Sequence, residues 1–263
     1  MSDTFSAVKA QEEALLCRSY SRYPVAVVRG KGSRLWDVDG KEYVDLLAGI
    51  AVTALGHCND EVCAALEAQA HKLWHVSNLF YQEEQLELAR LLLSTSHHGK
   101  AFFCNSGAEA NECLIKTARK WASDTKGEGE HPFVTLVNNF HGRTLTKLAA
   151  TAQPLKQEAF KPLPGGFIDV PQNDVAALEA AFANHDVCAV ILEVVQGESG
   201  VHPCSQEYME AVRRLTSENK ALMICDEVQC GMYRCGVPFA FQHYGVTPDI
   251  VAMAKGIAGG VPM

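Results

Sequence analysis

Charged residues stand directly after two short apolar runs of this 263-residue sequence. Asp226 follows Ala221–Cys225, and Lys255 follows Ile250–Ala254. A carboxylate at the end of a buried strand is unfavourable unless a cation or several hydrogen-bond donors face it. Two interpretations are open, and the residues alone favour the first, a structural ion pair between Asp226 and Lys255. The second is a shared cofactor, with Asp226 keeping a pyridine nitrogen protonated and Lys255 forming an imine with an aldehyde.

A predicted helix start near residue 106 could bind an anion. Ser106 and Glu109 form the pattern of a capping box, and apolar residues follow at helical spacing. The free N–H groups at Gly107 and Ala108 would be open to a phosphate, because neither side chain is bulky. An ordinary helix cap without a ligand explains the same residues. Neither the P-loop pattern nor G-x-G-x-x-G occurs, which argues against a nucleoside triphosphate or a dinucleotide.

Short β-rich runs alternate with helical patterns after residue 100, which predicts an α/β fold. Near-continuous apolar strands are typical of a parallel sheet covered on both faces. Strands are predicted at Ala101–Cys104, Phe133–Val137, Cys188–Val195, Ala221–Cys225 and Ile250–Ala254, and helices at Ala108–Trp121, Asp174–Phe182 and Ser205–Glu218. Because ligands in such sheets bind beyond the carboxyl ends of the strands, we expect the residues after these strands to converge on one crevice.

The first part of the chain follows a different pattern. Residues 25–47 are typical of an antiparallel β-meander, with a hairpin signal at Asp39-Gly40. A helix is predicted from Asn59, which is a suitable N-cap, and another over Glu83–Leu93. We therefore predict an N-terminal segment, residues 1–57, that is part of a small domain, and a large α/β domain, residues 58–263.

Composition and charge exclude several classes of protein. The net charge is -8, from 31 acidic and 23 basic residues, and no Lys/Arg run is present, which argues against nucleic-acid binding. The longest apolar stretch, Leu46–Leu55, is too short to span a membrane. No secretory signal is recognisable, so a cytoplasmic location is expected. The ten cysteines lack C-x-x-C spacing. We therefore expect reduced thiols, Cys230 and Cys235 included, and no metal site.

Four separated motifs resemble those of the class III pyridoxal-phosphate-dependent aminotransferases, in the same order. They are Phe102–Asn111, Phe140–Thr144, Asp226–Gln229 and Lys255, and Gly32–Asp37 and Gly49–His57 extend the resemblance across nearly the whole chain. The resemblance implies fold type I of these transferases: a mainly parallel sheet flanked by helices, with an N-terminal antiparallel β segment. It also implies a homodimer and pyridoxal 5′-phosphate as the cofactor, which the 58–263 domain would bind.

The implied activity is a transamination. The motifs are most similar to those of enzymes that move the δ-amino group of N2-acetylornithine to 2-oxoglutarate, a step of arginine biosynthesis. Similar enzymes act on succinylornithine, ornithine or 4-aminobutyrate, and these substrates remain alternatives. A truncated, non-catalytic member of the family is a further alternative.

The resemblance also implies roles for single residues. Lys255 would bind the cofactor covalently and move a proton, and Asp226 would pair with the ring nitrogen. Gly107 and Ala108 would bind the phosphate group. The remaining cofactor contacts would come from Phe140 and Val228, which would sandwich the ring, and from Gln229, near the ring hydroxyl. For Phe140 and Val228, simple core packing is the alternative.

Two further residues would contact substrates. Arg143 resembles the residue that binds the α-carboxylate of the amine substrate, for which a planar guanidinium is suited. Its alternative is an ion pair with a phosphate or at the surface. Glu198 resembles a glutamate that masks a second arginine until the 2-oxo acid arrives. Only eight residues follow Lys255, whereas members of the family continue further, so we expect an incomplete active site. Residues 1–263 alone are expected to have low solubility and little activity.

Overall fold

The computed structural model describes residues 2–96 and 99–263. The chain divides into two compact units, Met1–Tyr81 and Gln82–Met263, each considered by itself below. This division by compactness does not test the predicted domain boundary after residue 57, which stays a prediction. Among the described residues, no helix has the length and apolar character needed to cross a lipid bilayer.

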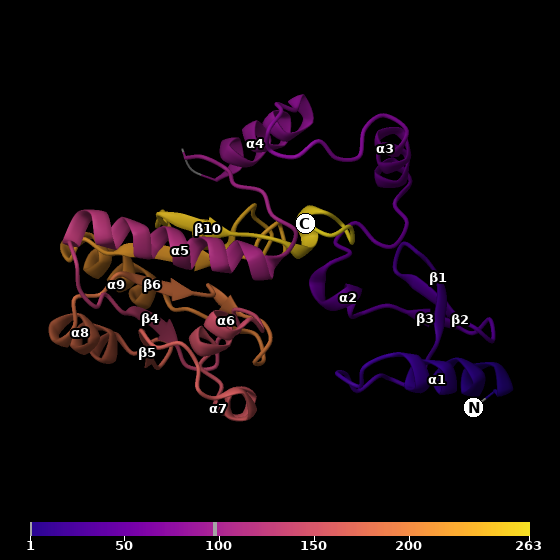
Figure 1. Cartoon of the computed structure of the whole chain (residues 1–263), viewed down its shortest axis with the longest axis horizontal. Coiled ribbons are helices and arrows are strands. Elements are labelled where there is room, and N and C mark those ends of the chain that lie inside the picture. Colours follow the sequence, from indigo (N-terminus) through magenta and orange to yellow (C-terminus); the bar gives the residue numbers. More distant parts are fainter. Residues whose placement is uncertain (1, 97–98) are drawn as a thin grey trace. The chain divides into compact units, whose positions relative to one another are not determined.

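The first unit contains the predicted antiparallel meander (Figure 1). Its elements are α1 (Asp3–Leu15), β1 (Val27–Lys31), β2 (Arg34–Asp37), β3 (Glu42–Val44), α2 (Ala48–Ala51) and α3 (Asp60–Ala70). The three strands pair in sequence order, as expected for a meander. Asn59 is the N-cap of α3, because its side-chain oxygen accepts hydrogen bonds from the N–H groups of Glu61 and Val62.

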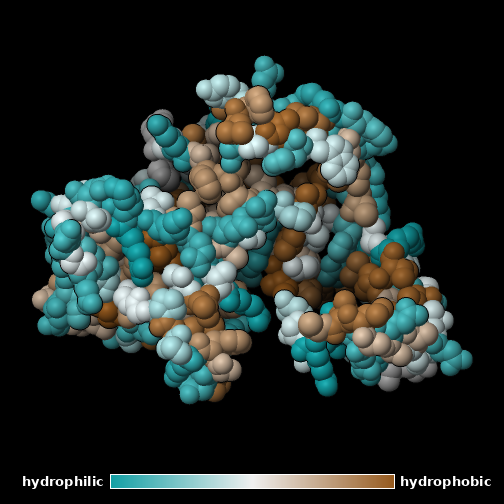
Figure 2. All heavy atoms as spheres, in the orientation of Figure 1, coloured by the Kyte–Doolittle hydropathy of each residue, from teal (hydrophilic) through white to brown (hydrophobic). Residues whose placement is uncertain are grey.

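Few side chains of the first unit are buried. Asp37 is the one described residue of this unit that is fully buried, and its carboxylate accepts bonds from two backbone N–H groups and from the Tyr43 hydroxyl. Large apolar residues, Leu46, Trp74 and Leu79 among them, are more than four-fifths exposed, and Figure 2 shows apolar side chains at the surface. The unit therefore buries little apolar surface of its own.

The second unit is built on a five-stranded sheet in which all strands are parallel, with the order β10-β9-β6-β4-β5. This confirms the predicted α/β class. Its elements are α4 (Glu83–Thr95), α5 (Gly107–Lys126), β4 (Phe133–Leu136), α6 (Leu145–Ala150), α7 (Pro154–Gln157), η1 (Glu158–Phe160), β5 (Phe167–Val170), α8 (Val175–Asn184), β6 (Ala189–Leu192), β7 (Val195–Gln196), β8 (His202–Pro203), α9 (Gln206–Glu218), β9 (Leu222–Asp226), η2 (Ala240–Tyr244), β10 (Ile250–Ala252) and η3 (Lys255–Ile257).

Helices cover both faces of this sheet, as the apolar strands predicted (Figure 1). Alternate residues of β6 belong to two different core clusters. Ala189 and Ile191 pack in the cluster that contains α5 residues, whereas Val190 and Leu192 pack in the cluster that contains α8 and α9 residues. Successive side chains of a strand point to opposite faces, so α5 lies on one face and α8 and α9 lie on the other.

Two strand predictions are wrong. Ala101–Cys104 has no strand structure, because within the described residues no strand lies alongside to supply backbone hydrogen bonds. The run Cys188–Val195 is not a single strand: β6 ends at Leu192, and Val195 belongs to β7, which pairs with β8 in a separate antiparallel ribbon. The sequence analysis also missed β5, which pairs with β4 at the edge of the sheet.

Candidate active site

The residues predicted to converge lie at the carboxyl edge of the parallel sheet, and the strand order contains a topological switch point. From β4, the chain places β5 on one side of it and β6, β9 and β10 on the other. Such a switch point leaves a crevice between the neighbouring strand ends. Residues that follow β4 and β6 meet there, since the N–H of Phe140 donates to Glu193 Oε2 at 2.7 Å.

The start of α5 is at the same edge. Ser106 is the N-cap and accepts a hydrogen bond from the N–H of Glu109, while the Glu109 carboxylate accepts one from the N–H of Asn105 rather than from Ser106. A Cβ atom on Gly107 would lie 2.9 Å from Val228 Cγ1 and 3.2 Å from Ala254 Cβ. The first turn of α5 therefore packs closely against the segments that follow β9 and β10.

Asp226 is buried and has three hydrogen-bond donors. Its Oδ2 accepts from Asn111 Nδ2 at 2.6 Å and lies 2.7 Å from His141 Nδ1, and its Oδ1 accepts from the N–H of Val228 at 3.1 Å. These partners satisfy the requirement for donors around a buried carboxylate. Among the described residues, no direct ion pair joins Asp226 to Lys255. The structural ion pair is thus not the arrangement that the chain adopts.

The proton of His141 is placed by its neighbours. Asn139 Oδ1 accepts from the N–H of Ala152 at 2.9 Å, which fixes the orientation of the Asn139 amide. Asn139 Nδ2 consequently faces His141 Nε2 as a donor at 2.8 Å, and Nε2 must be the acceptor. His141 Nδ1 is therefore the donor in the hydrogen bond to Asp226 Oδ2.

Lys255 begins η3, three residues after β10 ends, and has a positive φ of 52°. It is half-buried. Burial lowers the pKa of the Lys255 amine below its ordinary value, and the negative charges of Asp226 and Glu193 oppose this shift. A lowered pKa increases the fraction of neutral, nucleophilic amine at neutral pH.

Two buried glutamates support this edge. Glu193 accepts the Phe140 N–H, and burial together with the charge of Asp226 raises its pKa to about 8. Glu227 accepts the N–H groups of Ala240 and Phe241 at 3.0 and 2.9 Å, and its pKa is raised by burial. Glu227 thereby ties the loop after Asp226 to η2.

The predicted substrate residues lie near Phe140. The guanidinium carbon of Arg143 is 5.9 Å from the centroid of the Phe140 ring, and Lys156 Nζ is 4.8 Å from it. Glu198 forms an ion pair with Lys156 and accepts a hydrogen bond from Gln153 at 3.0 Å. Partial burial raises the pKa of Glu198, but these two bonds outweigh it and the pKa is lowered. Glu198 is therefore held by a lysine as well as placed near Arg143.

The other predicted cofactor residues also lie at this edge, in loops or at the start of α5. Val228 touches the start of α5, as described, and Ala108 is in the first turn of that helix. Gln229 packs directly against Gly197: a Cβ atom at position 197 would lie 1.5 Å from Gln229 Oε1 and would displace this side chain.

The sequence analysis missed the roles of Asn111 and Lys147. Asn111 lies one turn after Gly107 in α5, and that spacing is the one signal that could have placed it beside the strand ends. Lys147 is fully buried in α6, and its Nζ donates to the carbonyl of Gly107 at 3.0 Å. A lysine in a predominantly apolar helix turn is a weak signal, because lysine stems often cover apolar surface with the charge in water.

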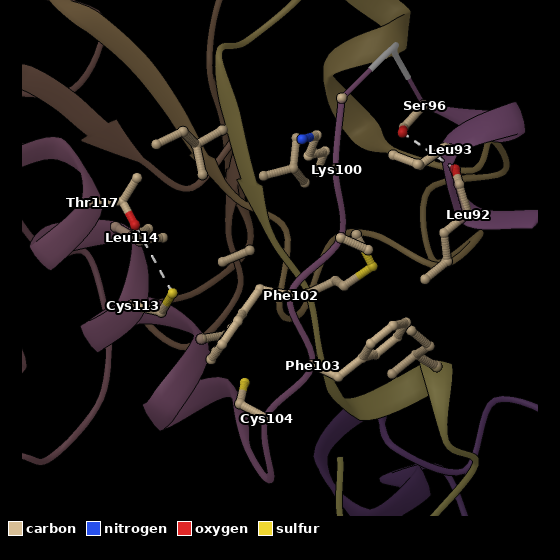
Figure 3. Close-up of a pocket in the computed structure, with 18 of the residues that line it drawn as sticks. Leu92, Leu93, Ser96, Lys100, Phe102, Phe103, Cys104, Cys113, Leu114 and Thr117 are labelled. Carbon is tan, nitrogen blue, oxygen red and sulfur yellow. Dashed lines mark hydrogen bonds between the residues drawn. The ribbon is translucent and has the colours of Figure 1, made fainter. Parts of the chain in front are cut away.

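A separate hollow of about 360 Å³ lies between the extended segment 100–104 and the free edge of β10 (Figure 3). Its lining is mainly apolar and includes Phe102, Phe103, Leu114 and Met253. None of the predicted site residues lines it. The hollow is therefore distinct from the strand-end crevice.

Comparison with known proteins shows to which family the chain belongs. The model of the family "Aminotransferase class-III" matches residues 16–263. The chain belongs to the class-III aminotransferases. Its curated relatives include the acetylornithine aminotransferase of Caldanaerobacter subterraneus, 49% identical over 252 residues, and that of Methanocaldococcus jannaschii, 50% identical over 244 residues. These alignments cover 96% and 93% of this chain but 64% and 61% of the relatives, so the chain spans about three fifths of their length.

Solved structures of two aminotransferases have the same fold. The ornithine aminotransferase of Toxoplasma gondii matches with a TM-score of 0.94 at 34% identity, over 99% of this chain and 62% of that one. The N-acetylornithine aminotransferase of Stenotrophomonas maltophilia matches with a TM-score of 0.82 at 40% identity, over 96% and 62%. The expected fold type, a mainly parallel sheet with an N-terminal antiparallel segment, is thereby confirmed.

Pyridoxal 5′-phosphate is the cofactor of this family, and in another Toxoplasma structure it partly occupies the active site. The strand-end crevice of this class-III aminotransferase fits that group. Asp226 presents a buried carboxylate suited to a protonated ring nitrogen, and Lys255 presents an amine with a lowered pKa. The buried Asn111 Oδ1 beside Asp226 lacks a partner among the described residues, so it is open to a polar group of a ligand.

Proposed function

We propose that this protein is a transaminase that moves the δ-amino group of N2-acetylornithine to 2-oxoglutarate, as in arginine biosynthesis. The observation that carries the proposal is the buried Asp226 carboxylate, which three N–H donors hold at the same sheet edge as the partly desolvated Lys255. The names of the relatives, at about half identity, support the substrate. When bound, pyridoxal 5′-phosphate supplies an aldehyde that takes up the amino group and a ring that accepts electrons.

In the proposed reaction, different residues of the chain bind the cofactor, orient it and move the proton. Asp226 keeps the ring nitrogen protonated, and His141 and Asn111 hold Asp226 in its orientation by donating hydrogen bonds to the same oxygen. Lys255 binds the cofactor through its Nζ and carries the proton between the substrate carbon and the cofactor. Gly107 and Ala108 hold the phosphate with backbone N–H groups at the start of α5. Phe140 and Val228 enclose the ring, and Gln229 hydrogen-bonds near the ring hydroxyl.

Arg143 binds the α-carboxylate of the substrate. In support of this role, its guanidinium carbon lies 5.9 Å from the ring of Phe140, which the proposal places beside the cofactor. Glu198 takes the role of a shield that an incoming 2-oxo acid displaces. The ion pair of Glu198 with Lys156, whose Nζ lies 4.8 Å from the centroid of the Phe140 ring, supports this role.

Chemical trapping tests the carbonyl chemistry. The purified protein is incubated with pyridoxal 5′-phosphate, reduced with borohydride, digested and examined by mass spectrometry. We expect one cofactor adduct, on Lys255. Lys255→Ala should lose it, and Lys120→Ala, which removes an exposed lysine of α5, should keep it. An adduct on other lysines only, or none, would contradict the proposal and favour a non-catalytic member of the family.

A panel of amines tests the substrate. With 2-oxoglutarate as acceptor, kcat/KM should be highest for N-acetylornithine, ahead of succinylornithine, ornithine and 4-aminobutyrate. Ornithine is the second candidate, because the ornithine aminotransferase of Toxoplasma has the higher TM-score of the two structures described above, 0.94 against 0.82. Preference for free ornithine would replace the proposed substrate and leave the reaction class intact.

We also propose a cytoplasmic homodimer. The exposed apolar side chains of the first unit, such as Leu46, Trp74 and Tyr81, support association with a second copy, since exposed apolar patches mark interaction sites. Light scattering coupled to gel filtration should give twice the monomer mass. A monomeric mass at micromolar concentration would overturn this part of the proposal.

A further inference from the structure

Lys147 is a buried cation that the roles given above do not use. It is 0% exposed, whereas a lysine side chain ordinarily keeps its ammonium group in water. Within residues 2–96 and 99–263, no carboxylate forms an ion pair with it, and its one hydrogen bond is donated to the carbonyl oxygen of Gly107 at 3.0 Å. A cation that is buried without a counter-ion is costly, so its position calls for a functional explanation.

The bond to Gly107 acts on the start of α5. The Gly107 carbonyl and the Ala108 N–H belong to the same peptide group. A charged donor on the carbonyl oxygen polarises that peptide and strengthens its N–H as a donor. Ala108 is in the first turn of α5, where N–H groups have no acceptor within the helix. Lys147 therefore orients and polarises an N–H group that the proposed function assigns to the phosphate.

The surrounding chain makes room for this lysine. Gly142 has a φ of 136°, and a Cβ atom there would lie 2.7 Å from Lys147 Cδ and 2.9 Å from Lys147 Nζ. A side chain at position 142 would thus displace the ammonium group. The carboxylates whose charges act on Lys147 are Asp226 at the end of β9 and Glu112 and Glu109 on α5, and the Cys104 thiol, whose pKa burial raises, precedes α5. None of them neutralises it by direct contact.

We propose that Lys147 is a positioning residue for the phosphate group of the cofactor: its ammonium holds the peptide between Gly107 and Ala108 and adds positive potential at the start of α5. This inference rests on the proposed function. It assigns to Lys147 a contribution to the binding of phosphate-bearing ligands, separate from any contribution to folding. The positive charge of Lys147 stabilises the phosphate indirectly: it polarises this peptide, and it raises the electrostatic potential at the start of α5.

The test compares two ligands that differ by the phosphate. Dissociation constants of pyridoxal 5′-phosphate and of pyridoxal are measured by equilibrium dialysis with the apo-protein at pH 7. Lys147→Met keeps the apolar stem and removes the charge, and Lys120→Met removes an exposed lysine of α5 as a matched control. We expect Lys147→Met to weaken binding of the phosphate ester about tenfold or more and to change pyridoxal binding by less than about twofold. The control should change neither constant.

The outcomes separate the possibilities. An equal loss for both ligands would show that Lys147 is merely structural and would overturn the inference, as would unchanged binding. If the unsubstituted protein binds neither ligand, the proposed function fails as well. Thermal denaturation checks folding, and Lys147→Met should be at least as stable as the unsubstituted protein, because an apolar residue replaces a buried charge.

A second measurement needs no variant. Burial lowers the pKa of Lys147 to about 8, against the opposing charges of Asp226 and Glu112. The ratio of the two dissociation constants should therefore move toward one as the pH rises from 7 to 9.5, since Lys147 loses its proton in this range. The phosphate is already doubly ionised there, with a second pKa of about 6, and effects common to both ligands cancel in the ratio. A ratio independent of pH would overturn the inference.

Discussion

Gly107→Ala tests the close packing on which the candidate site depends. Two effects of opposite sign compete. Alanine is favoured over glycine in a helix by about 0.5–1 kcal/mol. Against this, the new methyl group would lie 2.9 and 3.1 Å from the two Cγ atoms of Val228 and 3.2 Å from Ala254 Cβ. Overpacking of this kind costs about 1–3 kcal/mol. We therefore expect a net loss of about 1–2 kcal/mol in the free energy of unfolding.

The assay is urea denaturation of the apo-protein, with cofactor affinity measured in parallel. Gly165→Ala is the matched control, because a Cβ atom at Gly165 would meet no atom within 4 Å. It should leave stability unchanged or slightly raised. In the double variant Gly107→Ala/Val228→Ala, the two Cγ methyl groups of Val228 that clash with the new methyl group are absent. The loss in the free energy of unfolding should therefore be about 1 kcal/mol smaller than the sum of the losses in the two single variants.

The sign of the effect makes this prediction decisive. If Gly107→Ala is as stable as the unsubstituted protein, or more stable, then the gain in helix propensity outweighs the steric cost. The start of α5 would then not be tightly packed against Val228. Strict additivity in the double variant would refute the same contact. In either case the close packing of Gly107 against Val228 would be refuted.

Three further predictions concern charged residues of the site. Asp226→Asn should lower kcat about 100-fold or more in a coupled transaminase assay, because the ring nitrogen loses its counter-charge; a loss below threefold would refute that role. Glu193 has a pKa of about 8 against an ordinary 4.5, so the folded chain holds a proton that the unfolded chain releases, and stability falls as the pH rises between these values. This loss is on the order of 1.4 kcal/mol per pH unit in the free energy of unfolding, and Glu193→Gln should remove it in denaturation curves measured from pH 5 to 8. An unchanged dependence of the free energy of unfolding on pH would contradict this prediction. Arg143→Lys should raise the KM for the amine substrate about tenfold with a smaller effect on kcat, because lysine cannot bind a carboxylate through two parallel hydrogen bonds; an unchanged KM would point to the surface ion pair.

Strand ends and helix starts were predictable to within a few residues. The apolar run before Asp226 is β9, and the helix predicted after Ser106 is α5, which begins at Gly107. Both depend on local properties: side-chain periodicity and the capping of the first free N–H groups. The strand predicted at Ala101–Cys104 failed because a strand exists only where a neighbour completes its hydrogen bonds, and that is not a local property.

The partners of the site residues could not be predicted in the same way. Asp226 and Lys255 were expected either to pair with each other or to share a ligand, yet Asp226 binds Asn111 and His141, which lie 115 and 85 residues away in the sequence. Many donors could satisfy a buried carboxylate, and only the packing of α5 and of the loop after β4 selects among them.

The amino-acid sequence by itself determined the family, the alternation of strands and helices, and the edge of the sheet at which the polar residues gather, because each of these follows from neighbours along the chain and from motif order. The tertiary structure alone decided which groups lose contact with water. Lys147 is an unremarkable lysine in the sequence and a fully buried cation in the fold. Burial depends on every segment that covers a residue, and it is burial that shifts the pKa values of Lys147, Glu193 and Lys255.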